Sequence, residues 1–528
     1  MILRKKEKSL DTSESKFPLP FFILGAESTG TGIKGRMNQT EKNHPTGAVM
    51  VVGGGIGGMQ AALDLVESGY FVYLVDSSPA IGGVMAQLDK TFPTNDCSMC
   101  IMSPKLVECG RHLNIRVITH AEVEAIEGEA GRFSVTLNRK PRYIRSDRCT
   151  GCGECAKHCP VTAIDTYNEK LSQRAAIYIQ YPQAIPKVYL IDREQCIGCG
   201  LCERVCLAKA VDYSDKQQVE KIEVGSVILA TGYEMFDARL RPEFGYGVFP
   251  NVVTSIEFER LLSATGPHRG HLLRPSDGTI PERVAFIQCV GSRDSSCGNG
   301  YCSSVCCMYA TKEAIIAKEH VHFVKPTIFF MDVRAYGKGF DAYYENAKTK
   351  YGIRFIRCMV SKIRESLKTN NLLVTYLDDE GKLVDEEFEL VVLSVGMVPS
   401  QETVEMAKRI GVELEAHGFC KTTTFEPTST SRKGIYVCGA FQEPKDIPET
   451  VAQASAAAAE ASSLLAEARG TLIAEKKYVP EKNVNYEGPR VGAFICHCGI
   501  NIGGRSRCLS TPSGCCRGSC GGSQRNPR

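Results

Sequence analysis

The sequence has 528 residues, which corresponds to about three domains of ordinary size, and its 43% hydrophobic and 23% charged residues exclude collagenous, coiled-coil and wholly disordered chains. The formal net charge is only +3, so charge gives no reason to expect nucleic acid or a membrane surface as a partner. No apolar run reaches the roughly 18 residues of a membrane span, and the 25 cysteines, without a secretory signal, indicate metal or redox chemistry in the cytoplasm.

The first predicted elements form a βαβ opening. Residues 1–46 are polar and lack helical or strand periodicity, which predicts a disordered extension. The pattern then changes to a strand, Ala48–Val52, a glycine-rich turn, a helix over Met59–Ser68 and a second strand, Phe71–Val75.

The glycine-rich turn has the pattern Gly53-x-Gly55-x-x-Gly58 between a strand and a helix. Glycines here allow a tight turn and let backbone N–H groups approach a pyrophosphate at the helix N-terminus. Asp76 follows Gly58 by eighteen residues and ends the second strand, where a carboxylate accepts ribose hydroxyls and repels a 2′-phosphate. This favours FAD or NAD over NADP, the alternative being a structural turn. The candidate nucleotide-binding residues are Gly53, Gly55, Ile56, Gly57, Gly58 and Asp76.

Eight cysteines follow in two runs of the same spacing, C-x-x-C-x-x-C-x-x-x-C. Bacterial-type ferredoxins hold 4Fe-4S clusters with this run, and the fourth cysteine of each run binds the cluster of the other run. One cluster is therefore expected on Cys149, Cys152, Cys155 and Cys206, and the other on Cys196, Cys199, Cys202 and Cys159. Zinc is the structural alternative, because paired C-x-x-C motifs also bind it.

An apolar strand, Val224–Leu229, resumes after the cysteines, so the two-cluster segment is expected to be an insertion. A second α/β unit is predicted from three further apolar strands. The remaining expected elements are the strands Val284–Gln288, Thr327–Met331, Leu390–Ser394 and Gly434–Cys438 and the helix Thr450–Ala468.

Three short motifs are similar to those of two-dinucleotide-domain flavoproteins and favour FAD. Gly82-Gly83 resembles their second glycine pair, and Ala230-Thr231-Gly232 resembles their later strand and turn. Gly439-Ala440 resembles their late flavin motif, although Ala440 stands where those proteins usually carry Asp.

A second group of cysteines, Cys289, Cys302, Cys306 and Cys307, has the spacing C-x12-C-x3-C-C at the head of the second α/β unit. The strand before Cys289 does not lead into a Gly-x-Gly-x-x-Gly turn, so a second phosphate cradle is missing. The spacing alone leaves open a metal site and buried structural cysteines.

Cys97-x-x-Cys100 lies near the expected flavin. It fits a redox dithiol, the edge of a cluster or two core thiols, and the core interpretation is favoured. No catalytic acid, base or nucleophile is predicted.

Together these motifs resemble the flavin- and iron-sulfur-containing subunit of heterodisulfide reductase. The resemblance runs from about Ala48 to Gly470 and includes the segment from Pro444 to Gln453, which adds Ile447 to the cofactor-binding candidates. It implies a thioredoxin-reductase-like α/β flavoprotein with two dinucleotide domains and an inserted two-cluster ferredoxin domain. It also implies FAD, and a further 4Fe-4S cluster on Cys289, Cys302, Cys306 and Cys307.

The function implied by this resemblance is electron transfer, with possible flavin-based bifurcation, in an oligomeric complex. The implied partners are the other subunits of a heterodisulfide-reductase-like complex and an electron-donating hydrogenase, formate dehydrogenase or ferredoxin. Two alternatives are a non-catalytic electron-wiring protein and the soluble flavoprotein component of a quinone-interacting oxidoreductase. The missing second glycine motif disfavours a nicotinamide-dependent disulfide reductase.

The expected domain order places three parts of a FAD-binding domain around two insertions. Arg490–Gly504 is similar to the segment that opens the family's N-terminal module, and the likeness stops there, so we expect either the first unit of a duplicated chain or a broken reading frame. The expected ranges are 1–46 for the extension, 47–145, 216–280 and 396–470 for the FAD-binding domain, 146–215 for the ferredoxin insert, 281–395 for the second Rossmann-like domain and 471–528 for a linker and disordered tail.

Overall fold

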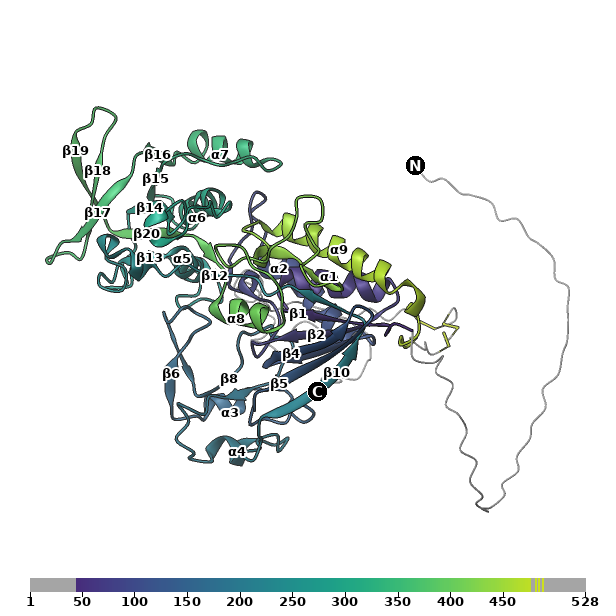
Figure 1. Cartoon of the computed structure of the whole chain (residues 1–528). Coiled ribbons are helices and arrows are strands. Elements are labelled where there is room, and N and C mark those ends of the chain that lie inside the picture. Colours follow the sequence, from purple (N-terminus) through teal and green to yellow (C-terminus); the bar gives the residue numbers. More distant parts are fainter. Residues whose placement is uncertain (1–43, 476–479, 482, 485–486, 489–528) are drawn as a thin grey trace, which may run out of the picture. The chain divides into compact units, whose positions relative to one another are not determined.

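The computed structural model describes residues 44–475, 480–481, 483–484 and 487–488 (Figure 1). The extension and the tail expected from the sequence lie almost entirely outside these residues. Within them, two α/β units each combine a five-stranded parallel sheet with a three-stranded antiparallel sheet. No helix in the described part of the chain is both long and apolar enough to cross a membrane.

The first parallel sheet is assembled from strands far apart in the sequence, in the order β22, β11, β1, β2, β3. Its central strand β1 reads Ala-Val-Met-Val-Val and is buried on both faces, as parallel sheets require. The strands are β1 (Ala48–Val52), β2 (Phe71–Asp76), β3 (Ile115–Thr119), β11 (Ser226–Leu229) and β22 (Ile435–Val437).

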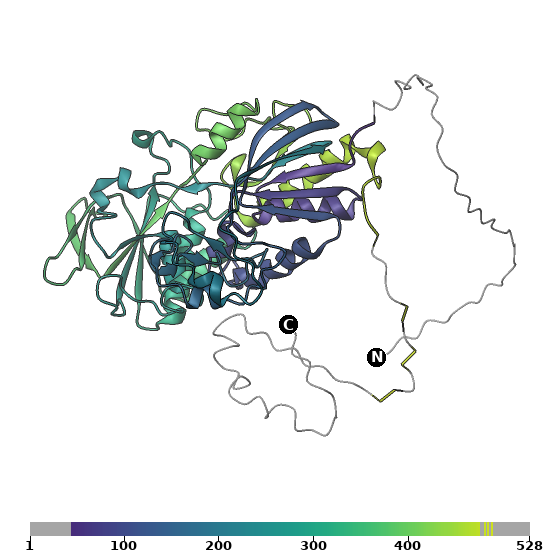
Figure 2. The ribbon, with the colours of Figure 1, turned by 90° about the horizontal axis from the view of Figure 1, so that it is seen from below.

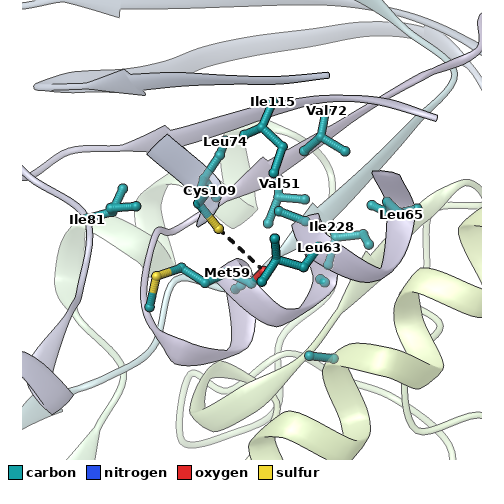
Figure 3. Close-up of a cluster of buried hydrophobic side chains, with 14 of the residues drawn as sticks. Val51, Met59, Leu63, Leu65, Val72, Leu74, Ile81, Cys109, Ile115 and Ile228 are labelled. Carbon is teal, nitrogen blue, oxygen red and sulfur yellow. Dashed lines mark hydrogen bonds between the residues drawn. The ribbon is translucent and has the colours of Figure 1, made fainter. Parts of the chain in front are cut away.

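Helices cover one face of this sheet, and an antiparallel sheet covers the other (Figures 1 and 2). On the helical side, Met59 and Leu63 of α1 pack against strand residues such as Val51 and Ile228 (Figure 3). Cys109 of α2 completes this cluster, with its sulfur 3.8 Å from the carbonyl oxygen of Met59. The covering elements are α1 (Ile56–Glu67), α2 (Ser98–Arg111) and α9 (Ile447–Leu464) on one side, and β4 (Ala121–Glu129), β5 (Arg132–Arg139) and β10 (Gln218–Val224) on the other.

The cysteine-rich segment leaves and re-enters the fold at neighbouring strands, because β5 and β10 pair antiparallel on either side of it. This is the geometry of an insertion, as the sequence predicts. The insert contains two short hairpins and two short helices: β6 (Thr162–Ile164), β7 (Gln173–Ala175), β8 (Ile177–Tyr178), β9 (Leu190–Ile191), α3 (Glu154–Lys157) and α4 (Leu201–Val205).

The second unit has a parallel sheet in the order β13, β20, β14, β15, β16 and an antiparallel sheet of β17, β18 and β19. A small two-stranded sheet pairs β12 (Glu234–Met235) with β21 (Met397–Val398). The other strands are β13 (Val252–Thr254), β14 (Arg283–Val290), β15 (Lys325–Phe330), β16 (Arg354–Arg357), β17 (Val360–Glu365), β18 (Leu372–Leu377), β19 (Leu383–Phe388) and β20 (Leu390–Val395), and the helices are α5 (Ser255–Leu262), α6 (Cys306–His320) and α7 (Phe340–Thr349). Helix α8 (Gln401–Arg409) belongs to the first unit, where Met406 and Ala407 pack in the same buried cluster as Val123 of β4.

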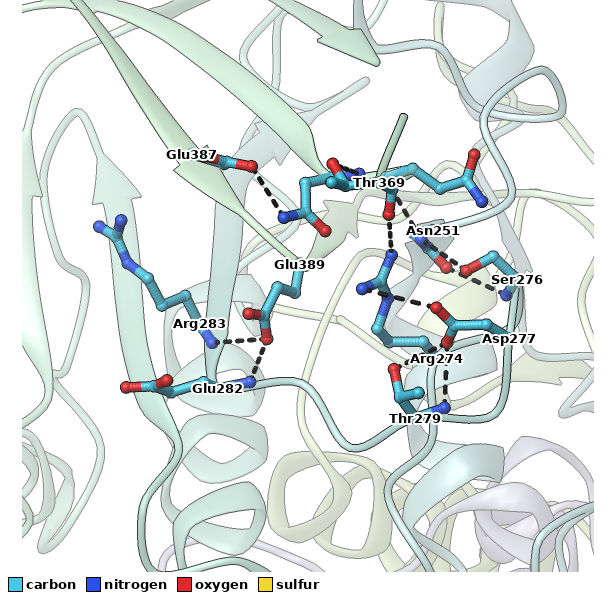
Figure 4. Close-up of polar contacts among 12 residues, drawn as sticks. Asn251, Arg274, Ser276, Asp277, Thr279, Glu282, Arg283, Thr369, Glu387 and Glu389 are labelled. Carbon is cyan, nitrogen blue, oxygen red and sulfur yellow. Dashed lines mark hydrogen bonds and ion pairs between the residues drawn. The ribbon is translucent and has the colours of Figure 1, made fainter. Parts of the chain in front are cut away.

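Polar contacts hold the loop before β14 against the antiparallel sheet (Figure 4). Arg274 donates to the carbonyl oxygen of Thr369 at 2.8 Å, and the amide of Asn251 donates to Ser276 at 3.0 Å. These bonds satisfy buried polar groups that would otherwise be costly at this junction.

Two element boundaries differ from the prediction for clear reasons. The strand expected over Val224–Leu229 is broken at Gly225, where a Cβ would lie 2.3 Å from the carbonyl oxygen of Thr46, so β10 and β11 enter different sheets. Helix α9 begins at Ile447 rather than Thr450, because Asp446 and Glu449 form a capping box. In addition, β13 pairs with β20, so the second sheet takes in a strand that precedes residue 281.

Candidate functional site

A cavity of about 640 Å³ opens where α1 begins and β2 and β11 end, and the second unit closes it with residues of α5 and α6. Its volume is within the range of cofactor-binding pockets. Of the predicted cofactor residues, only Gly58 and Gly82 do not line it. The others do so: Gly53, Gly55, Ile56, Gly57, Asp76, Gly83, Ala230, Thr231, Gly232, Gly439, Ala440 and Ile447.

The glycines of the first turn serve two different purposes. A Cβ at Gly58 would lie 1.8 Å from the carbonyl oxygen of Gly53, so Gly58 allows α1 to approach β1 closely. A Cβ at Gly55, in contrast, would meet nothing within 4 Å, although Gly55 lines the cavity at the start of α1. The open space at a helix N-terminus is suited to an anionic group such as a pyrophosphate.

Asp76 and Thr231 add polar groups to the same cavity. The Asp76 carboxylate accepts from the backbone N–H groups of Gly54 at 2.6 Å and Ser78 at 2.7 Å, and burial raises its pKa. The hydroxyl of Thr231 is buried and has no hydrogen-bond partner among the described residues. An unsatisfied hydroxyl facing a cavity fits a bound polar ligand, so the donor set and the open cradle fit FAD.

The sequence interpretation missed a buried charged group in the cavity wall. Lys312 of α6 pairs with Glu259 of α5, and both side chains are only 2–3% exposed. Glu313 also lines the cavity. Burial, followed by the nearby Glu259 carboxylate, raises the pKa of Glu313 well above its usual range. The sequence signal for these buried charges is the pair Lys312-Glu313 within the mostly apolar first part of α6.

The first ferredoxin-type run lies beside a small apolar core of the insert, with Cys152 exposed. Burial raises the pKa of Cys155 to about 12, with smaller contributions from the neighbouring Cys149, Cys152 and Cys202. Tyr189 packs in the same core. Cys149, Cys152 and Cys155 therefore lie together, as ligands of one cluster should.

The second run lies beside the last cysteine of the first. Burial raises the pKa of Cys202, with Cys196 and Cys159 among the neighbouring groups that also raise it. Backbone N–H groups point at two sulfurs of this region, from Gly198 to Cys196 at 3.5 Å and from Ala210 to Cys206 at 3.3 Å. Such N–H···S contacts tune cluster potentials, and the proximity of Cys159 to the second run is what crossed ligation requires.

The second cysteine group also converges. Cys289 is the last residue but one of β14 and lies in the left-handed region at φ 61°, and Cys306 and Cys307 begin α6. Burial raises the pKa of Cys289 to about 12, with further contributions from Cys307 and Cys302. A left-handed backbone at a non-glycine residue is strained, and such strain gathers at functional sites. The four sulfurs thus come from a strand end, a loop and a helix start in one place.

The turn after β14 packs closely against an aromatic ring. A Cβ at Gly291 would lie 2.1 Å from ring carbons of Phe236, so the aromatic ring fills the space beside this turn. This agrees with the absence of a second glycine-rich cradle from the sequence.

The core interpretation of the C-x-x-C pair at the start of α2 is wrong. Cys97 is half-buried and Cys100 is exposed. The reason is helical geometry, since the buried face of α2 is formed by residues such as Met102, Leu106 and Cys109, and Cys100 lies off that face.

Across the described ranges, no three His, Cys, Asp or Glu side chains are placed to hold one metal ion. A single zinc ion would draw four sulfurs to within about 3.8 Å of one another. In a four-iron cluster each thiolate binds a different iron atom, so the four cysteine sulfurs lie farther apart than around a single zinc ion. The chemistry of the donor set, eight cysteines in the ferredoxin order, fits such clusters.

Comparison with known proteins identifies the class of this fold. The profile described as pyridine nucleotide-disulphide oxidoreductase matches residues 186–461, more than half of the chain, and the 4Fe-4S dicluster domain matches residues 148–210. The chain therefore belongs to the pyridine nucleotide-disulphide oxidoreductase family, with an inserted dicluster domain, and the predicted fold class is confirmed.

The resemblance to the flavin- and iron-sulfur-containing subunit of heterodisulfide reductase is also confirmed. The chain is 49% identical over 431 residues to an iron-sulfur subunit of the CoB–CoM heterodisulfide reductase of Methanopyrus kandleri, a match that covers 81% of this chain and 66% of that protein. It is 48% identical over 412 residues to the corresponding subunit of the H(2)/formate:CoB-CoM heterodisulfide,ferredoxin reductase of Methanococcus maripaludis, covering 78% and 63%. The chain spans slightly less than two thirds of the length of these relatives.

Among solved structures, the chain is similar to the thioredoxin reductase of T. acidophilum. The TM-score is 0.45 at 16% identity, and the match covers 79% of this chain and 97% of that one.

Proposed function

We propose that the chain is a FAD- and iron-sulfur-dependent electron-transfer subunit of a heterodisulfide-reductase-like complex. The observation that carries this is helix α6. Its first turn supplies Cys306 and Cys307, and the residues that follow, Tyr309, Lys312 and Glu313, line the cavity. A flavin in the cavity and a cluster on these cysteines would share one helix, which is a short route for electrons.

FAD would supply the conversion between two-electron and one-electron chemistry. The chain would bind its pyrophosphate with the open cradle at Gly55 and its ribose with Asp76. Lys312 and Glu259 would place a buried ion pair in the cavity wall. Glu313, whose raised pKa favours the protonated form, would hold a proton beside the cavity.

Three 4Fe-4S clusters would carry electrons outward. Two would occupy the insert with crossed ligands, so that Cys206 completes the first run and Cys159 the second. The third would sit on Cys289, Cys302, Cys306 and Cys307. Here the N–H of Ser304 donates to the sulfur of Cys302 at 3.3 Å.

The partners proposed are the other subunits of such a complex and a hydrogenase, formate dehydrogenase or ferredoxin as electron donor. The names of the relatives support this, since one refers to H(2) or formate and to ferredoxin. A reducing compartment such as the cytoplasm is proposed because the cysteines that would bind the clusters have to remain reduced thiolates. Bifurcation at the flavin is part of the proposal.

The test is anaerobic purification of the chain with its copurifying subunits. Subunits with disulfide-reducing centres would support the proposal, whereas copurification with a quinone-reducing membrane protein would favour the quinone-interacting alternative. A chain with full iron content and no flavin would favour the electron-wiring alternative.

A further inference from the structure

The cavity contains a second buried lysine that the proposed chemistry does not use. Lys445 is 8% exposed and lines the cavity just before α9. Its ammonium donates to the amide oxygens of Gln442 at 2.6 Å and Gln453 at 2.8 Å. An ammonium has three donors, so these two neutral oxygens leave one N–H free of a hydrogen bond to them and supply no negative charge.

The charged neighbours of Lys445 are all at least partly solvated. Glu443 is 65% exposed, and its carboxylate lies 3.7 Å from the ammonium, too far for a hydrogen bond. Asp446 is half-buried and caps α9 through a bond from the N–H of Glu449, which is itself exposed. Solvent screens such charges strongly.

Lys312 makes the contrast clear. It lines the same cavity but contacts Glu259, which is as buried as itself. Of the two buried lysines that line the cavity in the described part of the chain, Lys445 is thus the one whose ammonium has no buried carboxylate within ion-pair distance. Buried charges are normally paired, so the geometry calls for an anion inside the cavity.

The position of Lys445 indicates that the anion beside it is the flavin ring and not the pyrophosphate. Gln453, which holds Lys445, also accepts from the N–H of Gly439 at 2.8 Å. The next residue, Ala440, packs with Val305 and Met397 in an apolar patch that also contacts Tyr309. Apolar walls suit a flat aromatic ring, whereas the open cradle at the start of α1 is the place for phosphates.

We propose that Lys445 stabilises the negative charge of the two-electron-reduced flavin ring and thereby raises the reduction potential of the bound flavin. The inference rests on the proposed binding of FAD. In the step concerned, the oxidised ring takes up two electrons from a reduced partner protein and one proton from solvent. The product carries one negative charge, delocalised over N1 and the C2 carbonyl, which the Lys445 ammonium would neutralise. Lys445 is therefore a positioning charge and not a proton donor.

The test compares FAD-loaded full-length wild type with K445Q, K445R and, as a control for loss of one exposed positive charge, K368Q. Anaerobic redox titration gives the flavin potential, and calorimetry gives the affinity for oxidised FAD. We expect K445Q to weaken binding of reduced relative to oxidised FAD about ten-fold, which lowers the potential by about 30 mV. K445R and K368Q should keep the wild-type potential.

An unchanged potential in flavin-loaded K445Q would overturn the inference. So would a loss of FAD affinity without a change of potential, because that would place Lys445 at the pyrophosphate. Failure of the wild type to bind FAD at all would instead overturn the proposed function.

A wild-type measurement covers the case in which K445Q does not fold. At a pH below the N1 pKa of free reduced flavin, one proton should accompany two electrons, so that the potential falls by about 30 mV per pH unit. A slope twice as steep, which means two protons, would contradict the proposed charge stabilisation.

Discussion

The two glycines of the first turn allow a direct test of where the pyrophosphate binds. Both are replaced by alanine, in Gly55→Ala and Gly58→Ala. The added methyl group is the same, but its surroundings differ. At position 58 it would overlap a backbone oxygen 1.8 Å away, whereas at position 55 it would enter open space at the cavity wall.

The expected magnitudes follow from these contacts. Gly58→Ala forces the backbone of the turn to move, which should destabilise the apoprotein by about 1–3 kcal/mol. Gly55→Ala should change apoprotein stability by no more than about 1 kcal/mol, the effect of a poorer N-cap residue. If the pyrophosphate fills the space beside Gly55, the added methyl group overpacks the complex with FAD and destabilises it by about 1–3 kcal/mol. FAD affinity then drops roughly 5- to 150-fold.

The assay combines urea unfolding of the apoprotein with calorimetric titration of FAD. Gly300→Ala is the matched control, because a Cβ there also meets nothing within 4 Å but the residue lies outside the cavity. Wild-type FAD affinity in a folded Gly55→Ala protein would refute the placement of the pyrophosphate at this turn.

Three further predictions concern the clusters, a buried acid and the electron donor. Cys152→Ala should remove about four iron atoms per chain while FAD stays bound, and loss of FAD together with the iron would contradict the separate sites. Burial, followed by the nearby Glu259 carboxylate, raises the pKa of Asp89 to about 6, so its contribution to stability is present below its unfolded value of 3.8 and is lost as the pH rises through 6. Asp89→Asn should remove this pH-dependent loss of stability, which is on the order of 3 kcal/mol. If the free energy of unfolding changed equally between pH 4 and pH 7 in the wild type and in Asp89→Asn, the reasoning would be refuted. NADPH should not reduce the flavin of the isolated chain, because the turn after β14 lacks the glycines that let a backbone approach a pyrophosphate. Rapid bleaching without a partner protein would show that a nicotinamide site exists.

Local sequence patterns predicted the elements whose signals lie close together in the chain. The strand Ala48–Val52 was expected with its observed bounds, because a buried parallel strand reads as a continuous apolar run. The break at Gly225 was not predictable, since its cause is a contact with Thr46 about 180 residues earlier. Likewise, the capping box of α9 extended a helix that apolar periodicity alone places later.

The residues that line the cavity also differ in how far local sequence could predict them. Its glycine loop and Asp76 follow a local pattern, so the sequence could indicate them. Lys312 and Glu259 are 53 residues apart and meet only because α5 and α6 pack together. The exposure of Cys100 also depends on which face of α2 the rest of the fold covers, and local sequence does not specify that face.

The central claim is that one chain holds one FAD and three 4Fe-4S clusters, with four cysteines for each cluster. Quantifying iron, acid-labile sulfide and flavin together in anaerobically purified protein tests it most directly. We expect about twelve iron atoms and one FAD per chain, since each cluster contains about four iron atoms. About four iron atoms or fewer in fully flavinated protein would contradict the claim.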